Sequence, residues 1–191
     1  MLGVALVAAV AQAAERAPST AEGFEVIRRE NVLMIEAANR RDLSRALFDL
    51  RRARGWHGQT ALVFEQQAEL VPRGAGCRLE AVRTTLVVTV TLPRLHRHGA
   101  ALDDPVFERL WQAAVNGLRV HEEGHVAIGI EGARIAHARL LAAGPFADCR
   151  AARRMLMREE FWFRHHQAVQ HERYDRRTGS GARQGAVLAP P

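Results

Sequence analysis

The chain of 191 residues contains no lysine, so all 27 of its basic side chains are arginine. The formal net charge is +6, but the arginines are scattered, with no dense basic stripe and no interleaved aromatic residues. Nucleic-acid-binding proteins usually gather their basic residues on one face or element. The sequence therefore argues against a nucleic-acid partner, and the arginine bias is more typical of nucleotide composition than of function.

Cysteine is also scarce, because only Cys77 and Cys149 are present. They do not form a Cys-x-x-Cys pair, so zinc ligation through sulfur is not expected. An even, minimal set of cysteines in an exported chain is typical of one disulfide, which here would close a loop of about 70 residues. Two unpaired buried thiols are the alternative.

A long apolar run is missing as well. The start, MLGVALVAAVAQAAERAPS, has an apolar run of about a dozen residues, which is too short to span a bilayer. Ala11-Gln12-Ala13 follows with the small-x-small pattern of a cleavage site, although no basic residue precedes the run. We predict that residues 1–14 are a signal peptide, with a buried N-terminal helix as the alternative. The protein is then periplasmic or secreted, without stable membrane insertion.

Residues 15–191 are expected to form a single α+β domain, because strand patterns come first and helical patterns follow. Strands are predicted at 23–37, 60–72 and 77–93, and the last two form a β-hairpin around the turn sequence RGAG. A helix begins at Asn39 or Asp42 and ends at Gly55. This part should form a small antiparallel sheet with one helix.

A long helical hairpin is predicted after the sheet. Its first helix has Asp104 as the cap and Pro105 at the first helical position, and ends at Gly144-Pro145. Its second helix runs from about Asp148 to Tyr174, and a Gly-rich tail follows.

The first of these helices contains His121-Glu122-Glu123-Gly124-His125, which spells H-E-x-x-H. Residues four apart place both imidazoles on one side of a helix, within joint reach of a zinc ion. Glu122 lies about 100° round the helix, off the metal axis but able to reach a bound water. The motif predicts zinc on the two histidines and Glu122 as general base and acid; a chance match in a charged helix is the alternative.

The surroundings of the motif favour the zinc site. The histidines belong to a stripe with helical spacing that we expect to face inward: Leu110, Ala114, Gly117, His121, His125, Ile128, Gly132 and Ile135. Gly117, Gly124 and Gly132 each cost roughly 1 kcal/mol in a helix relative to alanine. We therefore expect other parts of the protein to approach this helix closely.

The chain also resembles a bacterial family of predicted secreted zinc-dependent proteases, catalogued as a domain of unknown function. The resemblance covers nearly all of the chain after the leader. It lies in the strand-helix start, GCRLEAV, TLP, the tryptophan helix leading into HEEGH, the second cysteine and the closing RYDRRTGSGARQGA. It implies a zincin-like fold, pairing of Cys77 with Cys149, zinc on His121 and His125, and Glu122 as the catalytic acid-base.

A catalytic zinc needs a third protein ligand. On an antiparallel return helix, the height of the motif falls near residues 165–171, which include His165, His166 and His171. Asp175 is about one turn further. The resemblance favours Tyr174-Asp175 as the functional point of the closing segment, where Ser180 occupies a position at which the family often has histidine.

We therefore predict Asp175 as the third ligand and His171 as the alternative. Four other residues are considered less central. His165 and His166 are expected to be packing or surface residues, and Glu131 and His137 to be solvated. Tyr174 either donates a hydrogen bond to a developing oxyanion or packs on the tail, and packing is preferred.

The leading hypothesis is a zinc metalloprotease in which zinc polarises the scissile carbonyl and lowers the pKa of its bound water. Glu122 takes the proton of that water and delivers it to the leaving amine. The substrate is a peptide or protein. The alternatives are a non-catalytic metal-binding envelope protein and an amidase that acts on cell-wall peptides; side-chain preference and oligomeric state are not encoded in a recognisable pattern.

Overall fold

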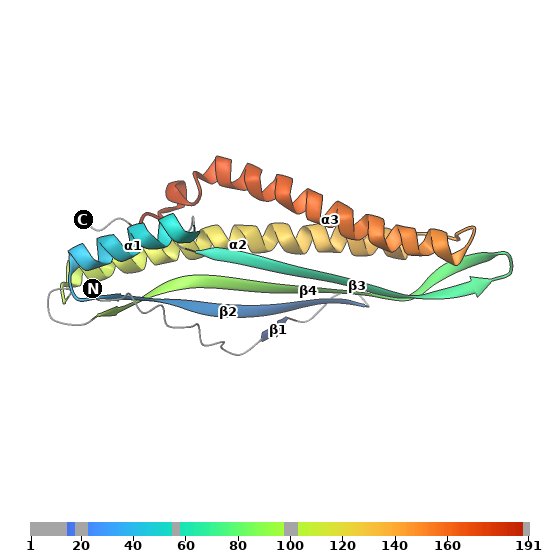
Figure 1. Cartoon of the computed structure of the whole chain (residues 1–191), viewed down its shortest axis with the longest axis horizontal. Helices are drawn as coiled ribbons and strands as arrows, with labels where there is room; N and C mark the ends of the chain where they lie inside the picture. Colours follow the sequence, from blue (N-terminus) through green and yellow to red (C-terminus); the bar gives the residue numbers. More distant parts are fainter. Residues whose placement is uncertain (1–14, 18–22, 55–57, 98–102, 189–191) are drawn as a thin grey trace.

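The computed structural model of the chain describes residues 15–17, 23–54, 58–97 and 103–188, so the predicted signal peptide lies outside the described residues. The elements in chain order are β1 (Glu15–Ala17), β2 (Phe24–Ala37), α1 (Arg40–Arg54), β3 (Gln59–Arg73), β4 (Gly76–Arg97), α2 (Pro105–Leu141), α3 (Cys149–Thr178) and the 3-10 helix η2 (Ala182–Gln184). The molecule is elongated, with a long sheet in one layer and the α2–α3 hairpin in another (Figure 1). The predicted α+β class is confirmed.

The sheet has the strand order β1-β2-β4-β3. The predicted hairpin of β3 and β4 is present, and β1 pairs with β2 in antiparallel orientation. β2 and β4 are parallel, however, so the expectation of an antiparallel sheet was wrong for this central pair. The second strand of the hairpin lies between β2 and β3. Alternation of apolar residues predicts which face of a strand is buried, but it does not predict which strand lies beside it.

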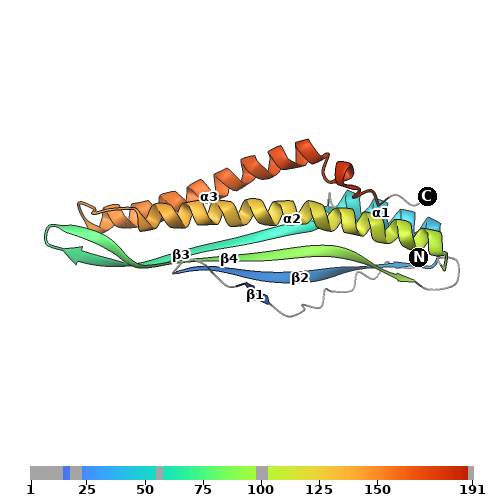
Figure 2. The ribbon, with the colours of Figure 1, turned by 180° about the vertical axis from the view of Figure 1, so that it is seen from behind.

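The side chains of β4 alternate between buried and half-buried, as suits a strand in the interior of the sheet. Leu86, Val88, Val90 and Leu92 are buried in the core, whereas Thr89 and Thr91 on the opposite face are half-buried, as the alternation predicted. The strand contacts both α2 and α3, and its start lies beside the first residue of α3. α1 packs its own leucines into the same core beside the start of α2 (Figures 1 and 2).

The long helices begin and end where their capping residues allow. The Asp104 side chain accepts a hydrogen bond from the Val106 amide, and Pro105 is the first helical residue, as predicted. Asp148 caps α3 in the same way through the Ala151 amide. α3 continues past Tyr174 to Thr178 and ends at Gly179, whose φ of 61° is the left-handed conformation that suits glycine.

The inward stripe predicted for α2 is largely correct. All of its members are buried or half-buried except Leu110, which is 51% exposed. Glu131 is exposed as expected, but the prediction for His137 was wrong: it is 3% exposed, and its Nδ1 lies 2.9 Å from Thr84 Oγ1. The reason is that the sheet and α3 cover α2 on two sides, so the buried band is wider than one stripe.

The glycines of α2 mark close approaches, as predicted. A Cβ on Gly117 would lie 2.4 Å from the carbonyl carbon of Gly185. On Gly124 it would lie 2.0 Å from the Tyr174 hydroxyl, and on Gly132 2.0 Å from the side-chain nitrogen of Gln167. The residues after α3 are therefore not a free tail. Residues 179–188, which we call the C-terminal segment, fold back over α2 through η2 (Figure 1).

The disulfide between Cys77 and Cys149 is confirmed. It joins the start of β4 to the first residue of α3, across a sequence separation of 72 residues. Backbone hydrogen bonds between Cys77 and Phe146 reinforce this connection. Among the residues that the structure describes, no helix combines the length and the apolar character needed to cross a lipid bilayer.

Candidate metal centre

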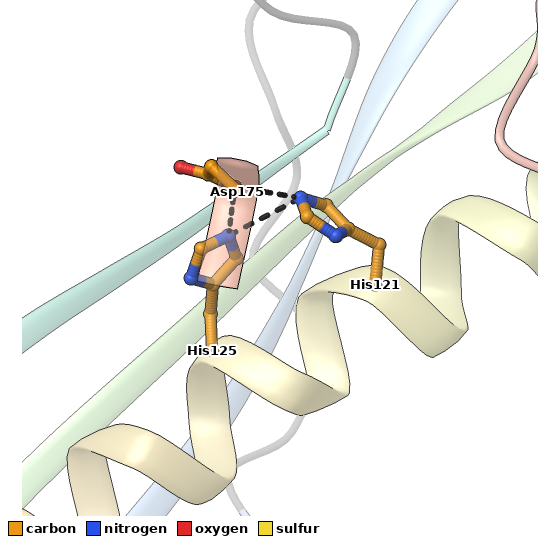
Figure 3. A group of neighbouring side chains, drawn as sticks. All are labelled: His121, His125 and Asp175. Carbon is orange, nitrogen blue, oxygen red and sulfur yellow. Dashed lines mark hydrogen bonds and ion pairs between the residues drawn. The ribbon is translucent and has the colours of Figure 1, made fainter. Parts of the chain in front are cut away.

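Three side chains from two helices converge on one point. His121 and His125 come from successive turns of α2, and Asp175 comes from the last turn of α3 (Figure 3). Asp175 Oδ1 lies 3.2 Å from His121 Nε2 and 3.1 Å from His125 Nε2. The two Nε2 atoms are 3.2 Å apart. Two imidazole nitrogens and a carboxylate oxygen at such distances could hold a metal ion together.

The structure brings together the predicted trio and leaves the alternative ligand outside it. His171 Nδ1 lies 2.6 Å from His125 Nδ1, the ring nitrogen that faces away from Asp175. The convergence falls one turn beyond residues 165–171 because α3 is inclined to α2 (Figure 1). His165 is exposed, and His166 stacks on Trp162 with ring centroids 4.6 Å apart, so both have the packing or surface positions expected of them.

Glu122 lies on the side of α2 that faces the sheet, and it is 3% exposed. Thr60 Oγ1, on β3, donates a hydrogen bond of 2.7 Å to Glu122 Oε2. Burial raises the pKa of Glu122, and the Thr60 hydrogen bond opposes that rise. A raised pKa favours a carboxyl group that must both accept and return a proton.

The next residue, Glu123, has different surroundings. It forms an ion pair of 2.5 Å with Arg28 of β2, and both side chains are partly exposed. Two adjacent glutamates thus face different surroundings, one buried beside the histidines and one paired at the surface.

Burial favours the neutral form of two of the histidines, His125 and His171. Burial lowers the pKa of His125, and the neighbouring Asp175 carboxylate opposes that change. Burial, followed by the proximity of His125, lowers the pKa of His171 to about 4. Neutral imidazole is the form that binds a metal ion.

A cleft of about 590 Å³ opens over the cluster. Its lining includes residues 58–60 at the start of β3, the motif on α2, the end of α3 and the C-terminal segment. Glu122 lines the cleft together with His121, His125 and Asp175. Ser180 lines it too.

Tyr174 is a packed residue. It is 8% exposed, its ring stacks on His121 with centroids 5.1 Å apart, and its hydroxyl accepts a hydrogen bond of 3.0 Å from Gln184 Nε2. This position agrees with the preferred expectation that Tyr174 packs on the tail.

Three polar residues near the cluster were not singled out in the sequence: Thr60, Thr178 and Gln184. Thr178 and Gln184 belong to the closing segment that carries the resemblance, but its pattern does not say which side chains face the histidines. Thr60 lies in an ordinary strand pattern. Its contact with Glu122 follows only from the packing of β3 against α2.

The comparisons with known proteins identify one family. Residues 34–182 match the family described as "Bacterial protein of unknown function (DUF922)". No curated protein and no solved structure matches the chain.

Proposed function

The chain belongs to the bacterial DUF922 family, and since the function of that family is unknown, we propose a function from the site itself: zinc-dependent hydrolysis of peptide bonds. The observation that carries this proposal is the convergence of His121, His125 and Asp175 beside a buried glutamate in an open cleft.

The donor set fits zinc. Ligand atoms about 2.0–2.1 Å from a tetrahedral ion lie roughly 3.3 Å from one another. The distances of 3.1 to 3.2 Å among the two Nε2 atoms and Asp175 Oδ1 are close to this value. Two histidines and one carboxylate also leave the open position that a catalytic zinc requires.

In this proposal, zinc supplies a Lewis acid that polarises the scissile carbonyl and lowers the pKa of water. Glu122 accepts a proton from the attacking water and transfers it to the leaving amine. Thr60 holds the Glu122 carboxylate through Oε2 and leaves Oε1 available for this exchange. A peptide or protein chain that enters the cleft is the proposed substrate.

We place this activity in the periplasm or outside the cell. The Cys77–Cys149 disulfide is typical of an oxidising compartment. The apolar start of the chain, with its small-x-small pattern, supports export.

Metal analysis combined with a cleavage assay tests the proposal. Purified without chelators, the protein should carry about one zinc per chain, and His121→Ala and His125→Ala should each lose most of it. It should cleave an unfolded protein or a mixed peptide library, stop after chelation and recover when zinc is restored. Normal zinc content in both variants would refute the site.

Two other results would replace the proposed activity. Bound zinc without any cleavage would favour a non-catalytic metal-binding envelope protein. Cleavage confined to cell-wall peptides would favour an amidase.

A further inference from the structure

Two side-chain oxygen atoms lie near His121 Nδ1, the ring nitrogen that does not face Asp175. Gln184 Oε1, from the C-terminal segment, lies 3.0 Å from His121 Nδ1. Thr178 Oγ1, at the end of α3, lies 3.4 Å from the same atom. An imidazole nitrogen can face an oxygen as donor or as acceptor, so the partners of these two oxygens decide which nitrogen carries the proton.

Thr178 has no hydrogen left for His121. Its hydroxyl donates to the Tyr174 carbonyl oxygen at 2.9 Å, as helical threonines often do one turn back. A hydroxyl has a single hydrogen, so Thr178 presents a lone pair to His121 Nδ1.

The side chain of Gln184 also presents an acceptor to His121 Nδ1. Its Nε2 donates a hydrogen bond of 3.0 Å to the Tyr174 hydroxyl, which leaves Oε1 facing His121. Tyr174 is itself held in place, because its ring packs over Gly124 and stacks on His121. Two acceptors thus converge on Nδ1, and they are satisfied only with a proton on that nitrogen. Nε2 faces a carboxylate oxygen, Asp175 Oδ1 at 3.2 Å, which a bound metal ion would engage in place of a proton on Nε2.

We propose that Gln184 is a positioning residue of the metal centre, which holds His121 in the Nδ1–H tautomer. His121 Nε2 then directs a lone pair at the point where His125 and Asp175 converge. The inference rests on the proposed function for the identity of the metal, but the effect of Gln184 on the Nδ1 proton can be measured without a metal. The C-terminal segment is therefore part of the centre, and Gly117 lets its backbone come close enough for Gln184 to reach the ring.

The tautomer can be measured directly by nitrogen NMR of the metal-free Asp175→Ala protein with ¹⁵N-labelled histidine, in which no carboxylate competes at Nε2, with His121 assigned by comparison with the added change His121→Asn. The Asp175→Ala protein should show His121 protonated on Nδ1. When Gln184→Leu, which has no acceptor, is added, the Nε2–H form should become populated. A His121 ring protonated on Nε2 in Asp175→Ala would overturn the proposal.

Zinc affinity, measured by competition with a chromophoric chelator, supplies the second readout. Gln184→Leu should weaken zinc binding by about 10–100-fold, the usual effect of losing the partner of a ligand. Gln184→Glu keeps an acceptor facing Nδ1 and should stay within a few-fold of the wild type. Gln112→Leu, the same change at an exposed α2 position, should have no effect.

These outcomes distinguish a positioning role of Gln184 from a role in packing alone. They also test this proposal separately from the proposed hydrolase activity. Equal loss of affinity in Gln184→Leu and Gln184→Glu would indicate a packing role, and unchanged affinity in Gln184→Leu would refute the proposal. If Gln184→Leu does not fold, the tautomer of His121 in Asp175→Ala and the zinc affinity of Gln184→Glu still decide. A protein that binds zinc through this tautomer but cleaves no peptide would refute only the proposed hydrolase.

Discussion

His121 and His125 lie on the same side of α2, but each ring is held by a different neighbour. Gln184 and Thr178 face Nδ1 of the first, and His171 faces Nδ1 of the second. Metal-ligating histidines commonly have such a partner on the other ring nitrogen, because it orients the ring and sets the tautomer. The Nε2 atoms of both rings are left to face Asp175.

Glu122→Gln should separate chemistry from metal binding. Glutamine keeps the size of the side chain and its hydrogen bond with Thr60, but it cannot accept a proton. Because general acid-base groups contribute about 10²–10⁴-fold, peptide cleavage should fall by at least that range. Zinc content and melting temperature should not change.

Glu123→Gln is the matched control for this variant. It removes only a partly exposed ion pair with Arg28, which is worth about 0–1 kcal/mol, so activity should be nearly unchanged. Equal cleavage by the wild type and Glu122→Gln would show that the hydrolytic mechanism is wrong.

The third ligand can be tested by comparing Asp175→Ala with His171→Ala. Asp175 Oδ1 faces both Nε2 atoms, so its loss should remove most of the bound zinc. His171 contacts only the far side of His125, so its loss should weaken binding by about 10–100-fold and leave the stoichiometry at saturation unchanged. The opposite result in metal titrations would make His171 the ligand.

Three glycines of α2 allow the C-terminal segment and two side chains of α3 to approach this helix closely. The C-terminal segment lies on Gly117, Tyr174 on Gly124, and Gln167 on Gly132. Each glycine weakens the isolated helix, so the close packing must supply the compensating free energy. The centre is therefore assembled by packing between elements, in addition to the spacing within one helix.

Gly117→Ala should displace the C-terminal segment while improving the helix. The new Cβ would meet the backbone of Gly185 and of its neighbours, which cannot rotate away as a side chain could. We expect faster hydrogen exchange in residues 179–188 and a loss of zinc affinity similar to that of Gln184→Leu. Helix propensity alone would add about 1 kcal/mol, so a protein that is simply more stable, with unchanged affinity, would contradict this prediction.

A suitable control is Asn116→Ala, next to Gly117 on α2. Asn116 is exposed, so its replacement should change neither the exchange rates of the segment nor the affinity for zinc.

The molecule has its candidate centre and its disulfide at opposite ends of α3. Cys149 is the first residue of that helix, and Asp175 lies in its last turn. The disulfide connects the sheet to the helical hairpin at one end of α3. The candidate metal cluster joins α2 to α3 toward the other end (Figure 3).

Replacing both cysteines by alanine should lower stability without removing the centre. The cross-linked loop spans 72 residues, and in the chain-entropy model such a loop contributes about 4 kcal/mol at the upper end. For a domain of this size the melting temperature should fall by roughly 8–16 °C. Zinc content at low temperature should be retained.

Thiol titration provides the companion measurement. Denatured, unreduced wild-type protein should show almost no free thiol. An unchanged melting temperature in the double variant would mean that the disulfide does not constrain the unfolded chain as this model assumes.

Local pattern was enough to predict β2, β3 and β4, the hairpin, both long helices, the Asp104 cap, and the presence of the H-E-x-x-H histidines on one helix face, but not the short strand β1. Asp104 and Pro105, for example, act on backbone groups within one turn, and residues four apart share a side of any helix. The closing glycines and Tyr174-Asp175 were visible as a motif, but their partners were not.

Other features depended on the packing of distant segments. The parallel pairing of β2 with β4, the burial of His137, and the contacts of Thr60 and Gln184 join residues that are far apart in the sequence or lie on different elements. Periodicity reports which face of an element is apolar, whereas neighbours across elements follow from strand order and from the inclination of α3 to α2. For the same reason, spacing predicted the two histidines on one helix, while the choice between Asp175 and His171 in the converging trio required the tertiary structure.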